Sequence, residues 1–165
     1  MALLGWMPFV AIAVSCVFSG WLSDRLIARG HTPTRVRKGF AGIGLTFATI
    51  LVPVVVVRDA NLALVLLTLA CLSFGVYTSN LFAITQSLAG PRAAGKWTSF
   101  QNGFGNLAGV LAASLTGRIV DRTGEFYLAF VVAAAFALAG AGMFVFGVGP
   151  IRPVTFRKSV KRATV

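Results

Sequence analysis

Five long apolar runs alternate with short polar segments along the chain. None of the runs contains Lys, Arg, Asp or Glu, and each approaches the length of about 20 residues that a helix needs to cross a bilayer. Barrel strands instead alternate apolar and polar positions over about ten residues. The pattern therefore predicts an all-α membrane protein with five transmembrane helices. The runs are Met1–Leu22, Gly39–Val57, Asn61–Ala83, Thr98–Gly117 and Phe126–Val148.

The composition also favours a membrane protein. The 165 residues are 57% hydrophobic and 12% charged, with a mean hydropathy of +0.85. A soluble domain carries about 25% charged residues, so this chain has too little polar surface to face water. The alternative, a soluble bundle of fully buried helices, does not account for five runs of membrane length. We divide the chain into a five-span bundle, residues 1–148, and a basic tail, residues 149–165.

The positive charge is concentrated on one side of the predicted membrane. The net charge is +11, and the cations gather in the first and third loops and in the tail. A nucleic-acid partner would account for the net charge. It would not explain why the cations gather in alternate loops, so we expect no nucleic-acid partner. The positive-inside rule makes these segments cytoplasmic, with the N-terminus outside the plasma (inner) membrane. The tail can also contact anionic membrane lipid. These cations are Arg25, Arg29, Arg35, Arg37, Lys38, Arg92, Lys96, Arg152, Arg157, Lys158, Lys161 and Arg162.

A short charged turn separates the first two runs. In it Asp24, Arg25 and Arg29 follow Gly20 and the apolar residues directly. A carboxylate at the end of a helix can accept hydrogen bonds from a helix N-terminus and can pair with Arg. We expect these four residues to form a conformational latch, with Arg92 as the partner that this chain offers to Asp24. The alternative is a solvated loop acid.

The fourth run has one small, polar face and one bulky, apolar face. At 100° per residue, Asn102 and Asn106 share a face with Gly105, Gly109 and Ala113. In lipid we expect the bulky face to point outward and the small face to meet another helix or a water-filled path. Helix packing explains the glycines, but two amides need polar partners. We predict a substrate path along Asn102 and Asn106, and helix packing at the other three positions.

The third run carries a weaker version of this pattern. Ser73, Tyr77 and Asn80 share a face at i, i+4 and i+7, and they are candidates for the same path. Hydrogen bonds between helices are the alternative reading for each of them. The second and fifth runs are almost free of polar residues, and we expect them to be lipid-facing supports.

No run offers the chemistry of an enzyme or of a metal centre. Cys16 and Cys71 lie within spans and are expected to pack as small apolar residues. His31 is the only histidine, and paired acids, nucleophile–base pairs and cofactor motifs do not occur. We therefore expect no catalysis, no metal and no cofactor.

Several of these segments resemble one transporter family. Gly20–Gly30, with the spacing G-x-x-x-D-R-x-x-x-R-G, resembles the loop signature of the major facilitator superfamily in its second copy, between helices 8 and 9. Gly95–Gly109 is similar to helix 11 of the anion:cation symporter group, and Thr116–Gly124 to the lead into helix 12. Gly5–Phe9 resembles the start of helix 8. The resemblance covers nearly the whole chain, to about Val148.

This resemblance implies that the chain forms helices 8 to 12, a partial C-terminal six-helix bundle. The implied function is transport of a small organic anion, such as a sugar acid or carboxylate, by alternating access coupled to proton or sodium. In this group the ionisable site residues lie mainly in the N-terminal half, which is missing here. Met1 is then an internal start or a fragment boundary. The alternative is a stand-alone five-helix protein that binds or scaffolds a partner without transport.

Overall fold

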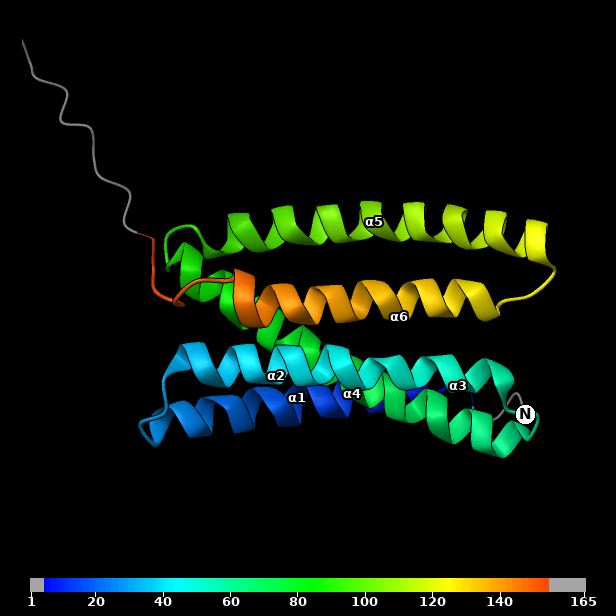
Figure 1. The fold of residues 1–165 in the computed structure, drawn as a ribbon. Helices are drawn as coiled ribbons and strands as arrows, with labels where there is room; N and C mark the ends of the chain where they lie inside the picture. The colour runs from blue at the N-terminus through cyan, green and yellow to red at the C-terminus, as the bar shows by residue number, and fades with distance from the viewer. Residues whose placement is uncertain (1–4, 155–165) are drawn as a thin grey trace, which may run out of the picture.

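The computed structural model describes residues 5–154, and every regular element among them is helical (Figure 1). The predicted all-α fold is therefore confirmed. Residues 1–4 and the tail residues 155–165 lie outside the described part. The elements are α1 (Met7–Ala28), α2 (Pro33–Phe47), a 3-10 turn (Ala48–Ile50), α3 (Leu51–Val56), α4 (Ala60–Ala89), α5 (Ala94–Thr123), α6 (Tyr127–Gly142) and a closing π-helical turn (Met143–Gly147).

The helices run back and forth between two ends of the molecule (Figure 1). The α1–α2 and α4–α5 connections and the segment after the π-helical turn lie at one end, which we name the basic end because Arg29, Arg92 and Arg152 belong to these segments. The α3–α4 and α5–α6 connections lie at the other end. This is the alternation that the cation pattern predicts.

Among residues 5–154, four segments are long and apolar enough to cross a membrane: α1, α2 continued through α3, α4, and α6 with its closing turn. The exception among the predicted spans is α5. It has 30 residues, but Gln101, Asn102 and Asn106 reduce its hydropathy. In lipid such a helix needs polar partners along one side.

At the basic end the helices extend beyond the apolar runs. The charged residues Asp24 and Arg25 belong to α1, so the predicted charged turn is mostly helix. Likewise α2 begins at Pro33, which makes Arg37 helical although the pattern placed it in a loop. Proline suits the first turn of a helix because it needs no hydrogen-bonded N–H there. A long basic side chain on a helix can extend to polar surroundings, so a charged residue does not have to mark the end of the helix.

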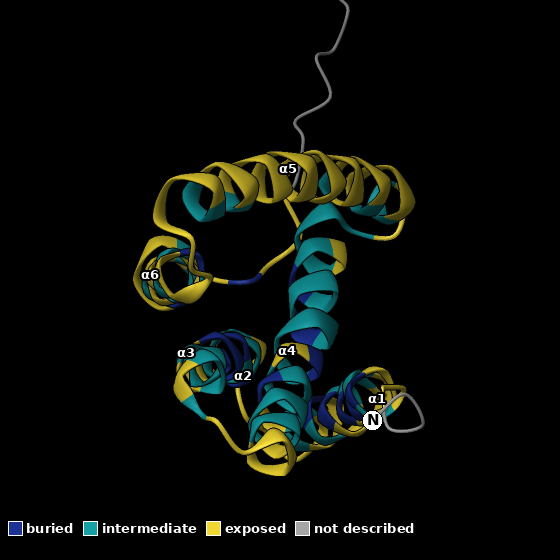
Figure 2. Cartoon of the chain, turned by 90° about the vertical axis from the view of Figure 1, so that its right-hand side faces the viewer, coloured by how far each residue is buried: buried dark blue, intermediate teal, exposed yellow. Residues whose placement is uncertain are grey.

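The tightest packing joins α1, α2 and α4. A side chain at Gly75 on α4 would overlap the Ser15 hydroxyl of α1, and Ser19 and Ser79 share a hydrogen bond of 2.7 Å between their Oγ atoms. On the other side of α4, an added Cβ at Gly44 of α2 would lie 2.7 Å from the Tyr77 nitrogen. Small residues let these backbones approach closely. The buried positions gather on these three helices (Figure 2).

The other pair, α5 and α6, is loosely held. No residue of α5 is buried, and only Ala129 and Ala141 are buried on α6. The two helices border an apolar groove of about 540 Å³, which lies between Ala108–Ile119 and Ala129–Phe136. Within the described residues, α5 is therefore the most exposed helix of the bundle (Figure 2).

Candidate functional site

The polar face of α5 is turned away from the helices of this chain. Asn102 and Asn106 are exposed, and Nδ2 of Asn106 donates to the backbone oxygen of Asn102 at 2.8 Å. Nothing lies within 4 Å of a Cβ added at Gly105 or Gly109, and Ala113 is exposed too. Among residues 5–154, none packs against this face. The small residues expected to pack therefore stay candidates for contact with something outside this part of the chain.

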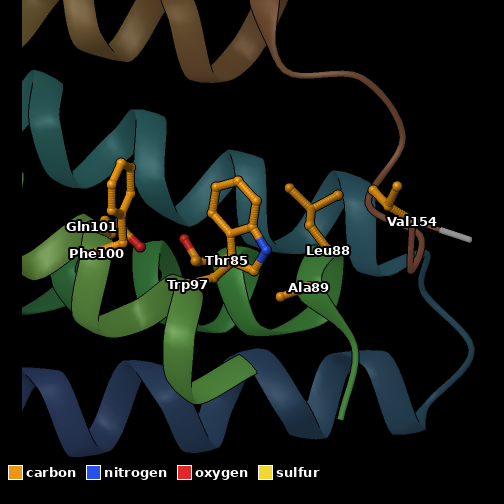
Figure 3. Close-up of a pocket in the computed structure, with 7 residues that line it drawn as sticks. All are labelled: Thr85, Leu88, Ala89, Trp97, Phe100, Gln101 and Val154. Atoms are coloured by element: carbon orange, nitrogen blue, oxygen red, sulfur yellow. The ribbon is translucent and has the colours of Figure 1, made fainter. Parts of the chain in front are cut away.

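Only part of the bulky side of α5 borders the bundle, and its large side chains stay exposed: Phe104 is 60% and Leu107 56% exposed. Trp97 and Phe100 line an apolar cavity of about 410 Å³ with Thr85 and Leu88 of α4 (Figure 3). Farther along, Leu111 of α5 lines the groove toward α6. Residues between the two faces, Gln101, Ala108 and Ala112, line the same cavity and groove, so neither face of α5 is covered by the described residues.

The three polar residues of α4 have different surroundings. Asn80 is 1% exposed; its Nδ2 donates to Val76 oxygen at 3.0 Å and to Ser79 Oγ at 3.3 Å, while its Oδ1 has no partner in the described part. Tyr77 is partly buried, with its ring 5.7 Å from that of Phe144. Ser73 donates to its own helix. No described hydrogen bond joins this trio to the amides of α5, so their place in a substrate path stays a prediction.

The candidate latch has a different partner from the one expected. Nη2 of Arg37 lies 3.6 Å from Oδ1 of Asp24, and no ion pair within residues 5–154 joins Asp24 to Arg92. Arg37 was missed as the partner of Asp24 because the charge pattern placed Arg37 in a loop. Pro33, a favourable first residue of a helix, could have indicated that Arg37 is helical. A cavity of about 630 Å³, bordered by Asp24, Arg37 and residues of α4, opens beside the pair.

The remaining latch residues lie on the same part of α1. The Arg25 guanidinium sits 5.1 Å from the centre of the Trp21 ring, a cation–π contact. Arg29 follows the last turn and is exposed. An added Cβ at Gly20 would be 3.8 Å from Ser79, an ordinary contact. These residues shape the end of α1 but make no direct bond to Asp24 in the described structure.

The segment after α6 folds back over the basic end. Nζ of Lys38 donates to Val148 oxygen at 2.6 Å, and Ile151 nitrogen donates to Thr34 Oγ1 at 3.0 Å. Ile151 is 6% exposed and packs with Ala41 and Ile84. The described start of the predicted tail is therefore anchored on α2 and α4 through Ile151, while its neighbours stay exposed.

Metal-binding chemistry is not found in the part of the chain that the structure describes. No group of three His, Cys, Asp or Glu side chains is placed to hold an ion there. Cys16 and Cys71 are free thiols, each partly exposed.

Comparison with known proteins identifies relatives along most of the chain. No protein-family model matches. The chloroplastic ascorbate transporter of Arabidopsis thaliana is 34% identical over 139 residues, 84% of this chain and 25% of that protein. The D-galactonate transporter of Escherichia coli (strain CFT073) is 29% identical over 148 residues, 90% of this chain and 34% of that protein. The mouse voltage-gated purine nucleotide uniporter SLC17A9 is 28% identical over 148 residues, which are 87% of this chain and 33% of that protein.

These relatives bear on identity in two ways. All three are named transporters, and none is named an enzyme. The chain spans about a quarter to a third of their lengths. The long apolar helices of the described residues agree with a place in a membrane transporter. Over most of its length the chain is therefore similar to part of these transporters, which supports its resemblance to anion transporters of the major facilitator superfamily.

Proposed function

We propose that the chain is part of a secondary transporter that moves a small organic anion, such as a sugar acid or carboxylate, by alternating access. The observation that carries this proposal is the polar face of α5, where Asn102 and Asn106 are exposed and a Cβ added at Gly105 or Gly109 meets nothing within 4 Å. Such a face requires polar partners or water in a membrane. An amide supplies two donors and an acceptor, so it can orient a carboxylate or hydroxyl without adding charge.

The rest of the transporter is the partner that this arrangement requires. In major facilitator proteins the site lies between two helix bundles that rock against each other. No acid or base lies inside the predicted apolar runs, whereas intramembrane charges usually accompany coupled transport. We therefore assign this chain to helices 8 to 12, and the charged binding groups to the missing N-terminal half.

Uptake by reconstituted vesicles tests the proposal. The transporter that contains this chain is reconstituted and offered labelled D-galactonate, ascorbate and phosphate, with and without proton and sodium gradients. We expect uptake of at least one anion, driven by one of the gradients. Uptake that follows only the membrane potential would replace coupled transport by uniport. A protein that binds partners and moves none of these anions would support the alternative, a five-helix scaffolding subunit.

We also propose that the basic end is cytoplasmic and that the protein lies in the plasma (inner) membrane, with its N-terminus outside. The distribution of Lys and Arg supports this orientation. Arg35→Cys and Thr123→Cys, each in a background without Cys16 and Cys71, place a thiol at opposite ends of the helices. An impermeant thiol reagent added outside intact cells should label only Thr123→Cys. Labelling of both positions from outside would refute this orientation.

A further inference from the structure

One arginine joins three helices at the basic end. Nη1 of Arg37, on α2, donates to the backbone oxygen of Ala83 at 2.8 Å and to the Ser87 hydroxyl, both on α4. Nη2 reaches Asp24 on α1 at 3.6 Å. A guanidinium can do this because it presents donors in a planar fork. Arg37 thus connects α1, α2 and α4 through one side chain.

The two members of the ion pair are held very differently. The Arg37 side chain is 16% exposed and keeps two hydrogen bonds to α4, whereas the Asp24 side chain is 73% exposed. An exposed ion pair at this distance contributes little to stability, because water and salt screen it. Arg37 is therefore the fixed member, and Asp24 keeps most of its side chain exposed beside the 630 Å³ cavity that both residues border.

The helix that carries Arg37 is itself held in place at this end. Thr34 and Lys38, one turn before and one residue after Arg37, bind the returning segment at Ile151 and Val148. Val154 of the same segment donates to the backbone oxygen of Leu88 on α4 at 2.9 Å. The first two turns of α2 are therefore hydrogen-bonded both to α4 and to the segment that returns after α6.

We propose that Arg37 is the positioning residue of the latch: it fastens α2 to α4 and holds the Asp24 carboxylate at the edge of the cavity. This inference rests on the proposed function, in which Asp24 engages the rest of the transporter. Arg37 stays bound to α4 while Asp24 changes partners. The pair with Asp24 is the exchangeable contact, and the bonds to Ala83 and Ser87 are the permanent ones.

Thiol labelling in native membranes tests the fastening without any transport assay. Ile84, on α4, is 3% exposed and packs with Ala41 of α2, so Ile84→Cys reports separation of these helices. Hydrogen bonds to a charged group are strong, and Arg37→Ala should raise its labelling rate on the order of tenfold. Asp24→Asn and the matched control Arg35→Ala, an exposed cation on the same helix, should each change it less than about twofold.

A second measurement separates positioning from mere packing. Asp24→Cys places a thiol beside the guanidinium, which should favour an anionic thiol reagent over a cationic one of equal size. Arg37→Ala should lower that preference several-fold, Arg37→Lys should retain most of it, and Arg35→Ala should leave it unchanged. If Arg35→Ala and Arg37→Ala behave alike, or if Asp24→Asn loosens Ile84→Cys as much as Arg37→Ala does, the proposal is wrong. Vesicles that transport no anion would overturn the proposed function, while these labelling results would stand.

Discussion

The two sides of this bundle use the same kind of residue in opposite situations. On α1 and α4, Ser15, Ser19 and Gly75 let two helices approach closely, and all three residues are buried. On α5, Gly105 and Gly109 form a similar face, but a Cβ added at either glycine would meet no neighbour within 4 Å. The first face is a completed helix interface. The second has the composition of one and lacks its partner in the described chain.

This difference shows where the chain is self-sufficient and where it is not. The α1–α2–α4 unit has close backbone approach, a hydrogen bond between serines and the Arg37 connection. By contrast, α5 borders α4 and α6 around a cavity and a groove, and none of its residues is buried. We infer that the first unit holds its shape alone and that α5 is completed by the rest of the transporter.

Replacing one glycine on each side should give the largest contrast. Gly75→Leu places a side chain where the Ser15 hydroxyl and the α1 backbone already lie, and such overpacking should cost about 3 kcal/mol or more. Gly109→Leu meets open space in this chain and should leave its thermal stability within about 0.5 kcal/mol. Thermal unfolding of the purified chain in detergent measures both. Equal losses would mean that the two faces do not differ.

The matched amides of α5 test the substrate path. In the reconstituted transporter, Asn102→Ala should weaken apparent anion affinity about five-fold, which corresponds to about 1 kcal/mol for one hydrogen bond, at unchanged stability. Asn106 also lies on the path, but it is adjacent to Gly105 and one turn from Gly109, where close approach of another helix is expected in the whole transporter. Asn106→Ala should therefore lower the transporter's stability and expression as well. The affinity is read from uptake of whichever anion the vesicles transport. Intact affinity together with a destabilised Asn102→Ala protein would assign Asn102 to packing.

The serine contact between α1 and α4 should have the smallest effect. Ser19→Ala removes the 2.7 Å hydrogen bond to Ser79. Hydrogen bonds between membrane helices average about 0.6 kcal/mol, so unfolding should shift by about that amount. Ser114→Ala is the control, because that hydroxyl is exposed on α5 and bonds only to its own helix at Val110. If Ser19→Ala lowers the free energy of unfolding by more than about 2 kcal/mol, the α1–α4 contact depends on polar bonds rather than on close backbone approach.

Hydrophobic length predicted the fold class and the order of the helices, because a bilayer requires apolar segments of fixed length. It did not predict where helices end. Pro33 starts α2 well before the apolar run at Gly39, since backbone hydrogen bonding and not hydropathy sets that boundary. Periodicity identified the two faces of α5 but could not show that residues between them, such as Gln101 and Ala112, border the rest of the bundle. One helix alone shows which residues share a face, and only its neighbours decide where that face points.

The Asp24 partner was beyond the sequence pattern for a similar reason. Arg92 and Arg37 are both cations at the basic end, and no periodic signal separates them. The choice depends on how α2 packs against α4, which brings Arg37 beside Ala83 and Ser87. Pairing across helices is a property of tertiary packing, so charge alone could indicate the side of the membrane but not the pair.

Water accessibility along α5 in native membranes tests the central claim most directly. Asn102→Cys lies on the small polar face, and Leu107→Cys lies on the bulky apolar side, 56% exposed in this chain. Both are made without Cys16 and Cys71, in the transporter that contains this chain. A small hydrophilic thiol reagent should label Asn102→Cys and leave Leu107→Cys unlabelled, because one faces a water-filled path and the other faces lipid. Equal labelling, or labelling of Leu107→Cys alone, would contradict a substrate path along α5.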